Sequence, residues 1–265
     1  MITVLLKREW KSNYKIFFIF IAVLTLYESL IVAMYDPKLG ESLNLMAKSM
    51  PQLFAAFGMM DPGLTLLDFI TNYLYGFILT VIPLIYTIIM CHRLMARYID
   101  KGSMAYLLTT PHTRTQIMAT ELMVLLSGVI LLIVYSVVLI LGCSIVMFSE
   151  SLNIGKFFVM NIGLLGIHML FACICFLTTC CFNETKLSIG IGAGIGIGSL
   201  LIQMLSQVSD KIDFLKYMTP LTLFNAKGLQ VYDQQAVFNT VILFVLAVGC
   251  IIATYIIFKN RDLPL

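Results

Sequence analysis

The chain has 265 residues and a formal net charge of +3; 60% of its residues are hydrophobic, only 12% are charged, and its mean hydropathy is +0.97. An ordinary soluble domain carries about 25% charged residues, so this composition excludes a soluble globular domain and indicates a chain that needs lipid as its solvent. The small net charge gives no basis for expecting nucleic-acid binding.

The first apolar run covers residues 15–35. It is longer than the core of a cleavable signal peptide, which has roughly 7–15 residues, so we expect it to remain as a transmembrane helix. Glu28 lies inside this run, but about a dozen Ile, Leu, Phe and Val residues, at roughly −0.3 to −0.6 kcal/mol each, outweigh one acid that costs about +3 kcal/mol. The preceding "VLLKREWKS" mixes apolar and basic residues with Trp10, which predicts a separate interfacial helix.

Hydropathy averaged over about 19 residues predicts six spans and hence an all-α membrane protein with one transmembrane domain over 1–265. An even number of spans places both termini on one side of the membrane. Eleven of the 17 lysines and arginines fall on that side, so the positive-inside rule places both termini in the cytoplasm. The predicted spans are 15–35, 69–91, 117–147, 157–180, 187–206 and 237–258.

Two spans carry features of their own. Pro83 lies in the middle of the second span, which predicts a kink and a freed backbone carbonyl that a neighbouring helix satisfies. The third run is long for a bilayer, so its first turns are expected to stand in the cytoplasm and to lift Glu121 out of the hydrocarbon.

A polar segment separates the second and third spans. Gly102 and Ser103 can cap a short helix, in which Met104, Leu107 and Leu108 form an apolar stripe at i, i+3 and i+4. These residues predict a short amphipathic helix on the cytoplasmic side, lying across the membrane surface.

The sequence also predicts where this short helix ends and where the third span begins. Pro111 ends the short helix, and Thr113 with Gln116 has capping-box spacing that starts the third span. The apolar stripe needs a partner, which is lipid, the chain's own bundle or another protein.

The whole chain resembles the six-span permease subunits of the second type of bacterial ABC exporters. The six spans agree with this family, and so does the absence of a G-x-x-x-x-G-K-[ST] motif. The stretches that carry the resemblance, in order, are "LLKREWKS", "MPQLFAAFGM" (50–59), "KGSMAYLLTTPHTR" (101–114), "YMTPLTLFNAKG" (217–228) and "FKNRDLPL" (258–265).

The resemblance implies a multi-pass protein of the bacterial cytoplasmic membrane that works with two separate ABC ATPase subunits and a second permease subunit, identical or related. ATP and Mg²⁺ would bind in the ATPases, and the chain itself would be neither an enzyme nor a cofactor carrier. The cytoplasmic segment would be the coupling helix that docks on the ATPase, with Leu107 and Leu108 as its inserted anchors and Arg114 as a charged contact. The alternative is an amphipathic helix lying on lipid. The residues assigned to coupling are Lys101, Gly102, Ser103, Tyr106, Leu107, Leu108, Pro111 and Arg114.

The fifth span contains "SIGIGAGIGIGSLL", residues 188–201. The spacing differs from G-x-G-x-x-G and no strand precedes it, so it does not indicate a dinucleotide site. Gly190, Gly194 and Gly198 share one helix face, which allows another helix to approach closely. The resembling permeases place their subunit interface on the first and fifth spans, so this face is predicted to lie at the dimer interface; packing within one subunit is the alternative.

Three ionisable residues lie within the predicted spans: Glu28, His168 and Glu121. Such groups are candidates for function, either as contacts for cargo or as polar contacts between helices. The family often has a lysine at the start of the third span where this chain has Glu121, so any role of that lysine does not carry over.

All seven cysteines lie in or at the ends of apolar runs, which argues against a disulfide framework in exported loops. The stretch "FACICFLTTCC" holds four of them, and thiolates bind soft metals. Cysteine is also a common small apolar residue in spans, and we expect no metal site.

The predicted function is export of an amphipathic or hydrophobic cargo, such as a peptide, an antibiotic or a lipid. The resemblance also implies short helices between the fifth and sixth spans that re-enter the outer leaflet. Two other classes are considered: an ATP-independent channel or proton-coupled carrier, and an intramembrane enzyme. A carrier would need a polar stripe or broken helices in paired halves, and an enzyme would need catalytic groups that face one another.

Overall fold

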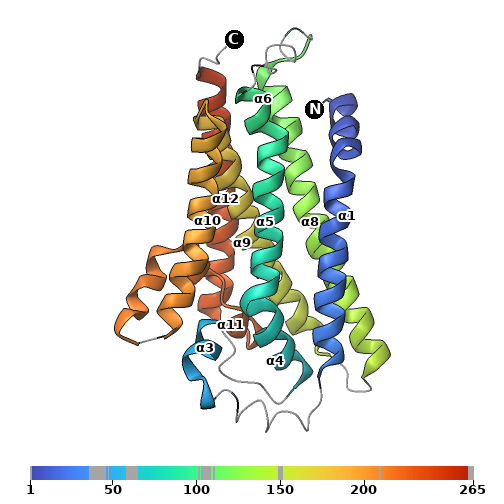
Figure 1. Cartoon of the computed structure of the whole chain (residues 1–265), viewed down its shortest axis with the longest axis vertical. Coiled ribbons are helices and arrows are strands. Elements are labelled where there is room, and N and C mark those ends of the chain that lie inside the picture. Colours follow the sequence, from blue (N-terminus) through green and yellow to red (C-terminus); the bar gives the residue numbers. More distant parts are fainter. Residues whose placement is uncertain are drawn as a thin grey trace.

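A computed structural model describes residues 2–35, 46, 48–57, 65–100, 102, 109, 111–148, 152–208 and 210–261, except for the side chains of 210–213. Within these ranges every regular element is a helix. Long helices run side by side in one bundle, and both chain termini lie at the same end of it (Figure 1).

Six helices are long and apolar enough to cross a membrane, which confirms the six predicted spans by length and composition. Five are α-helices: α1 (Thr3–Ala33), α8 (Arg114–Met147), α9 (Ile154–Cys181), α10 (Thr185–Val208) and α12 (Gln234–Asn260). The second span is a continuous helix of changing pitch. It comprises α4 (Leu66–Ile70), the π-helix η2 (Thr71–Ile78), α5 (Leu79–Cys91), the π-helix η3 (His92–Ala96) and α6 (Arg97–Asp100).

The predicted N-terminal interfacial helix is not a separate element. Thr3–Ala33 is one uninterrupted helix of 31 residues, because nothing between these residues is a glycine or proline that would break it. At 1.5 Å per residue it is about 46 Å long, which exceeds the roughly 30 Å of a hydrocarbon core. Its first turns therefore extend the first span rather than forming a second element.

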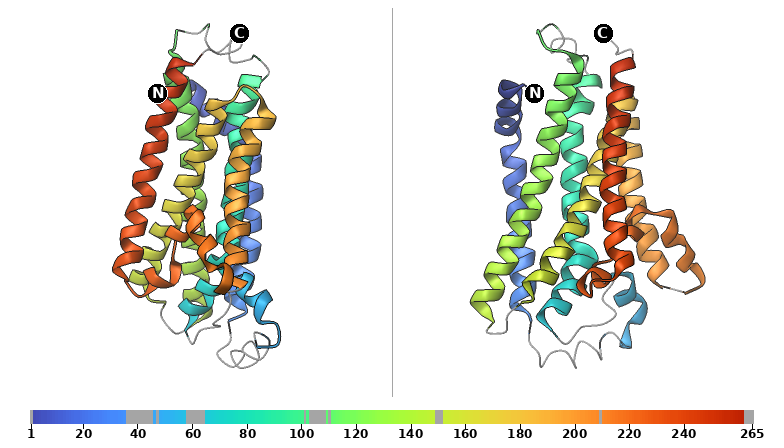
Figure 2. Two further views of the ribbon diagram at one scale, coloured as in Figure 1. Left: turned by 90° about the vertical axis from the view of Figure 1, so that its left-hand side faces the viewer. Right: turned by 180° about the vertical axis from the view of Figure 1, so that it is seen from behind.

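The helix α9 is the centre of the bundle. It packs against α5, α8, α10 and α12, and its Phe157, Phe171 and Phe176 are fully buried. The helix α1 packs mainly along α8, and Figure 2 shows α1 and α12 at the periphery on different sides. The peripheral helices present most of the exposed apolar side chains, as expected for surfaces that face lipid.

Short helices gather at the end of the bundle opposite the termini (Figure 1). Between the first and second spans α3 (Pro51–Ala56) packs on α10. Between the fifth and sixth spans lie the 3₁₀ helices η4 (Asp210–Met218) and η5 (Pro220–Leu223), followed by α11 (Ala226–Gln230). The helix η4 turns back along α10. Short helices are thus present in this region, and their re-entry into a membrane leaflet stays a prediction.

One glycine permits a close contact between two spans. A Cβ added at Gly128 on α8 would overlap the hydroxyl oxygen of Tyr86 on α5, and Tyr86 is only 1% exposed. Small residues let helices in lipid approach one another in this way.

Gly128→Ala is therefore expected to lower the free energy of unfolding by about 1–3 kcal/mol, the usual cost of overpacking. Gly142→Ala on the same helix is the matched control, because no described atom lies within 4 Å of its added Cβ. Thermal unfolding in mild detergent compares the two variants. Equal losses of stability would contradict the proposed contact.

Candidate functional site

The first end of the segment that joins the second and third spans is fastened to the fifth span. The backbone N–H of Thr185, at the start of α10, donates to Asp100 Oδ1 at 3.4 Å. The Thr185 hydroxyl donates to the carbonyl of Ala96 at 3.3 Å. Gly102 has φ +64°, and its N–H bonds back to the Ile99 carbonyl at 3.1 Å. This geometry is typical of a residue that closes the preceding helix. The short helix that Gly102 is predicted to cap falls on residues 103–108, which lie outside the described residues.

The second end of the same segment is fastened to the fourth and sixth spans. The Thr113 hydroxyl accepts from the Gln116 N–H at 3.3 Å, and Gln116 Oε1 accepts from the Thr113 N–H at 3.2 Å. This confirms the predicted capping box. Arg114 Nη1 donates to the carbonyl of Arg261 at 2.8 Å, and the Arg261 guanidinium donates to the Cys180 carbonyl and to Asn183 Oδ1.

Five of the predicted coupling residues lie outside the described residues: Lys101, Ser103, Tyr106, Leu107 and Leu108. Pro111 is described and exposed. Arg114, predicted as a contact for the ATPase, directs one guanidinium nitrogen to the chain's own C-terminal end. The structure thus describes the two ends of the predicted coupling segment, where it is hydrogen-bonded to other spans, and not the helix between them.

The glycines of α10 divide between two faces. A Cβ added at Gly190, Gly194 or Gly198 would meet no described atom within 4 Å, whereas one at Gly192 would meet Thr178 and Cys175, and one at Gly196 would meet Leu84. We call the first three the open glycine face. Packing of α10 within the described chain uses the other two glycines, so the open glycine face is available to a helix from outside.

His168 satisfies the carbonyl that Pro83 frees. Proline lacks the N–H that would bond to the carbonyl four residues earlier, which here is that of Leu79. His168 Nε2 lies 2.8 Å from this carbonyl oxygen, and because a carbonyl only accepts, Nε2 is the donor. His168 is 0% exposed. The prediction that a neighbouring helix satisfies the carbonyl is confirmed, and His168 makes a polar contact between helices.

Replacing His168 by Leu removes this donor, and we expect a loss of about 1–3 kcal/mol in the free energy of unfolding, because the Leu79 carbonyl is left without a partner. In a Pro83→Ala background the restored backbone N–H takes over, so the same replacement costs less. A double-mutant cycle followed by thermal unfolding in detergent measures the difference. An equal cost in both backgrounds would show that the Leu79 carbonyl is not what His168 stabilises.

Glu28 and Glu121 are both 0% exposed but lie in different neighbourhoods. Ser136 on α8 is the polar neighbour of the Glu28 carboxyl group, whereas Glu121 lies near Glu9 of α1. Glu121 is therefore enclosed by protein, and the placement of the first turns of the third span in the cytoplasm stays a prediction. The structure does not bring Glu28, His168 and Glu121 together.

Beside Glu121 lies a polar cluster that the sequence analysis missed. Tyr98 donates its hydroxyl to Glu9 Oε1 at 2.9 Å, Arg93 Nε donates to Asn13 Oδ1 at 2.6 Å, and Asn13 Nδ2 donates to Glu9 Oε2 at 3.4 Å. Glu9 and Asn13 are four residues apart and therefore share one helix face. This spacing is the only feature of the sequence that could have indicated the cluster. The cluster ties α1 to the second span at the end where the termini lie.

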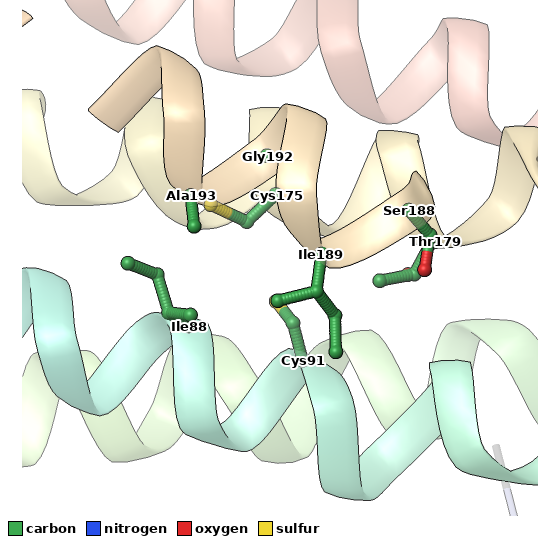
Figure 3. A pocket seen from close by; sticks show the side chains of 8 residues that line it. All are labelled: Ile88, Cys91, Cys175, Thr179, Ser188, Ile189, Gly192 and Ala193. Carbon is green, nitrogen blue, oxygen red and sulfur yellow. The ribbon is translucent and has the colours of Figure 1, made fainter. Parts of the chain in front are cut away.

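The cysteines form no metal centre that the described residues reveal: no group of three or more His, Cys, Asp or Glu among them could hold a metal ion. Cys91 on α5 and Cys175 on α9 are both buried. Figure 3 shows them at a small apolar pocket that Ile189 and Gly192 of α10 help to line. They serve as small apolar residues in helix packing.

A large cavity in the described part of the chain lies at the end opposite the termini. It has a volume of about 730 Å³. Residues of η2, the C-terminal part of α10, the short helices that follow α10, and the start of α12 line it. π-Helical turns often mark functional sites, and the π-helix η2 contributes Asn72 and Tyr75 to the lining. The sequence predicts only an interfacial, partly apolar segment here.

A family model described as "Protein of unknown function (DUF2705)" matches residues 20–264. No curated protein matches the chain significantly.

Proposed function

The chain belongs to the DUF2705 family, and we propose that it is the membrane permease subunit of an ATP-driven ABC exporter. In this proposal two separate ABC ATPase subunits bind and hydrolyse ATP with Mg²⁺. A second permease subunit, identical or related, completes the path. The cargo is amphipathic or hydrophobic, such as a peptide, an antibiotic or a lipid, and leaves the cytoplasm or the inner leaflet.

The observation that carries the proposal is the anchoring of the 101–113 segment at both ends. Asp100 and Ala96 hold Thr185 at the start of α10, and Arg114 holds Arg261 at the end of α12. A force applied to this segment therefore reaches the second, third, fifth and sixth spans through direct hydrogen bonds. The ATPases supply that force when they close on ATP, with Leu107 and Leu108 as the inserted anchors.

The open glycine face supports the second subunit. Without a hydrophobic effect to drive association in lipid, helices associate through close packing of small residues. Gly190, Gly194 and Gly198 offer such a surface and are not covered by the described part of the chain. In the proposal this face meets the partner permease, so movement of α10 at Thr185 changes the dimer interface directly.

The proposed orientation places both termini and the 101–113 segment in the cytoplasm of a bacterium, with the chain in its cytoplasmic membrane. The short helices then lie at the outer surface. On η4 the side chains of Phe214, Tyr217 and Met218 are 63%, 74% and 73% exposed, and Lys216 lies between them. Apolar, aromatic and basic residues together suit an interfacial helix, which supports the re-entrant placement in the outer leaflet.

An intramembrane enzyme fits less well, because Glu28, His168 and Glu121 lie apart. His168 is already engaged with Leu79, and Glu28 and Glu121 have different neighbours. A catalytic site would need such groups within hydrogen-bond reach of one another.

Affinity purification of the chain from its native cells in mild detergent is expected to recover a P-loop ATPase. Leu107→Asp with Leu108→Asp is expected to reduce the recovered ATPase roughly tenfold or more, because charges then replace apolar anchors in a buried contact. Leu107→Ile with Leu108→Ile is the matched control and is expected to keep the ATPase. Recovery of the chain alone, or ATPase retained by the Asp variant, would overturn the coupling assignment.

Gly194→Leu is expected to abolish association of two permease subunits, because a large side chain on the open glycine face holds the partner helix away. Gly249→Leu on α12 is the control, since an added Cβ there also meets no described atom within 4 Å. Both variants are expected to fold equally well. Native mass spectrometry of the detergent-solubilised protein reads the subunit number, and loss of the dimer in both variants or in neither would contradict this interface.

A further inference from the structure

We propose that the 730 Å³ cavity at the outer end binds the uncharged, polyhydroxylated headgroup of a membrane amphiphile, such as a glycosyl diacylglycerol. As a site for cargo this inference rests on the proposed function. As a binding site it stands on the chemistry of the lining and of the surface around it.

The lining is rich in neutral groups that both donate and accept hydrogen bonds. The π-helix η2 supplies Thr71, Asn72 and Tyr75, and α10 supplies Gln203 and Gln207. Amide and hydroxyl side chains match the hydroxyl groups of a ligand, because each partner can act as donor and as acceptor. Aromatic rings of Tyr75, Phe77 and Phe224 are also in the lining, and their faces suit the apolar face of a sugar ring.

Gln203 distinguishes a hydroxylated headgroup from a phosphate. Its Oε1 is buried and has no hydrogen-bond partner among the described residues. This oxygen needs a donor, and leaving such an acceptor unmatched is unfavourable. A hydroxyl group of a sugar donates to it, whereas a phosphodiester has no hydrogen to give. Lys216 and Lys227 also line the cavity, and their ammonium groups donate to hydroxyl oxygens as well.

The surface beside the cavity is apolar, which points to an amphiphile rather than a free sugar. Leu201 and Leu205 on α10 are 56% and 54% exposed, and Tyr217 and Met218 on η4 are exposed further still. Acyl chains can lie against these residues while the headgroup occupies the polar interior. The helix η4 turns back along α10 (Figure 2), and both helices contribute residues to the cavity lining. In the proposal the ligand enters beside these two helices, from the membrane surface.

The test measures lipid binding to the purified chain in detergent by native mass spectrometry, without ATP and without an ATPase. The probes are glucosyl diacylglycerol, diacylglycerol, and phosphatidylmethanol, which is a phosphodiester without a hydroxyl group; all three have the same acyl chains. We expect glucosyl diacylglycerol to bind most tightly. Gln203→Leu, which keeps the side-chain volume, is expected to weaken its binding about threefold to tenfold, the loss of one hydrogen bond.

Gln207→Leu is the second variant and is expected to act in the same direction, so the test does not depend on one protein folding. Gln52→Leu is the matched control, because Gln52 on α3 is exposed at the same end and lies outside the lining. Equal binding of the three lipids, tighter binding of phosphatidylmethanol, or unchanged affinity in both glutamine variants would overturn the inference. If the chain binds glucosyl diacylglycerol selectively but no ATPase co-purifies with it, the binding site is supported and the exporter proposal is contradicted.

Discussion

Hydrocarbon offers a backbone carbonyl or N–H no water to bond with, and this constraint governs the whole chain. Most of the bundle satisfies it with uninterrupted helices, of which α1 and α8, at 31 and 34 residues, are the longest. The second span contains two π-helical stretches, which still bond their own backbone, and Pro83, which leaves the Leu79 carbonyl without its usual donor. His168 on the central helix α9 supplies the missing hydrogen-bond donor to the Leu79 carbonyl. That hydrogen bond satisfies, inside the bundle, the one carbonyl that Pro83 frees.

The two ends of the bundle have different chemistry. At the end with the termini, side chains fasten one span to another: Glu9 with Tyr98, Asp100 with Thr185, and Arg114 with Arg261. At the other end, short helices surround a cavity with a polar lining and an apolar border. In the proposed function the first end receives movement from the ATPases and the second releases cargo. The helix α10 connects the two, because it begins at Thr185 and ends in the cavity wall.

The number and position of the spans could be predicted from the sequence because hydropathy is a local property. The capping box at Thr113 was predictable for the same reason, since its partners are three residues apart. Contacts between distant residues were not predictable. Pro83 indicates that some helix must supply a donor, but nothing local singles out His168. Both glycine sets of α10 repeat every fourth residue, so periodicity does not say which one faces outward. The cavity draws its lining from segments more than 100 residues apart, and therefore leaves no compact motif.

The central claim is that ATP hydrolysis by a partner drives movement of cargo through this chain. The most direct measurement reconstitutes the chain with its co-purified ATPase in proteoliposomes and follows a fluorescent amphiphile across the bilayer, with ATP, without ATP, and with the chain alone. The account predicts movement only when the chain, the ATPase and ATP are all present. Movement of the amphiphile, or of protons or ions, by the chain alone would contradict it and favour a carrier or a channel.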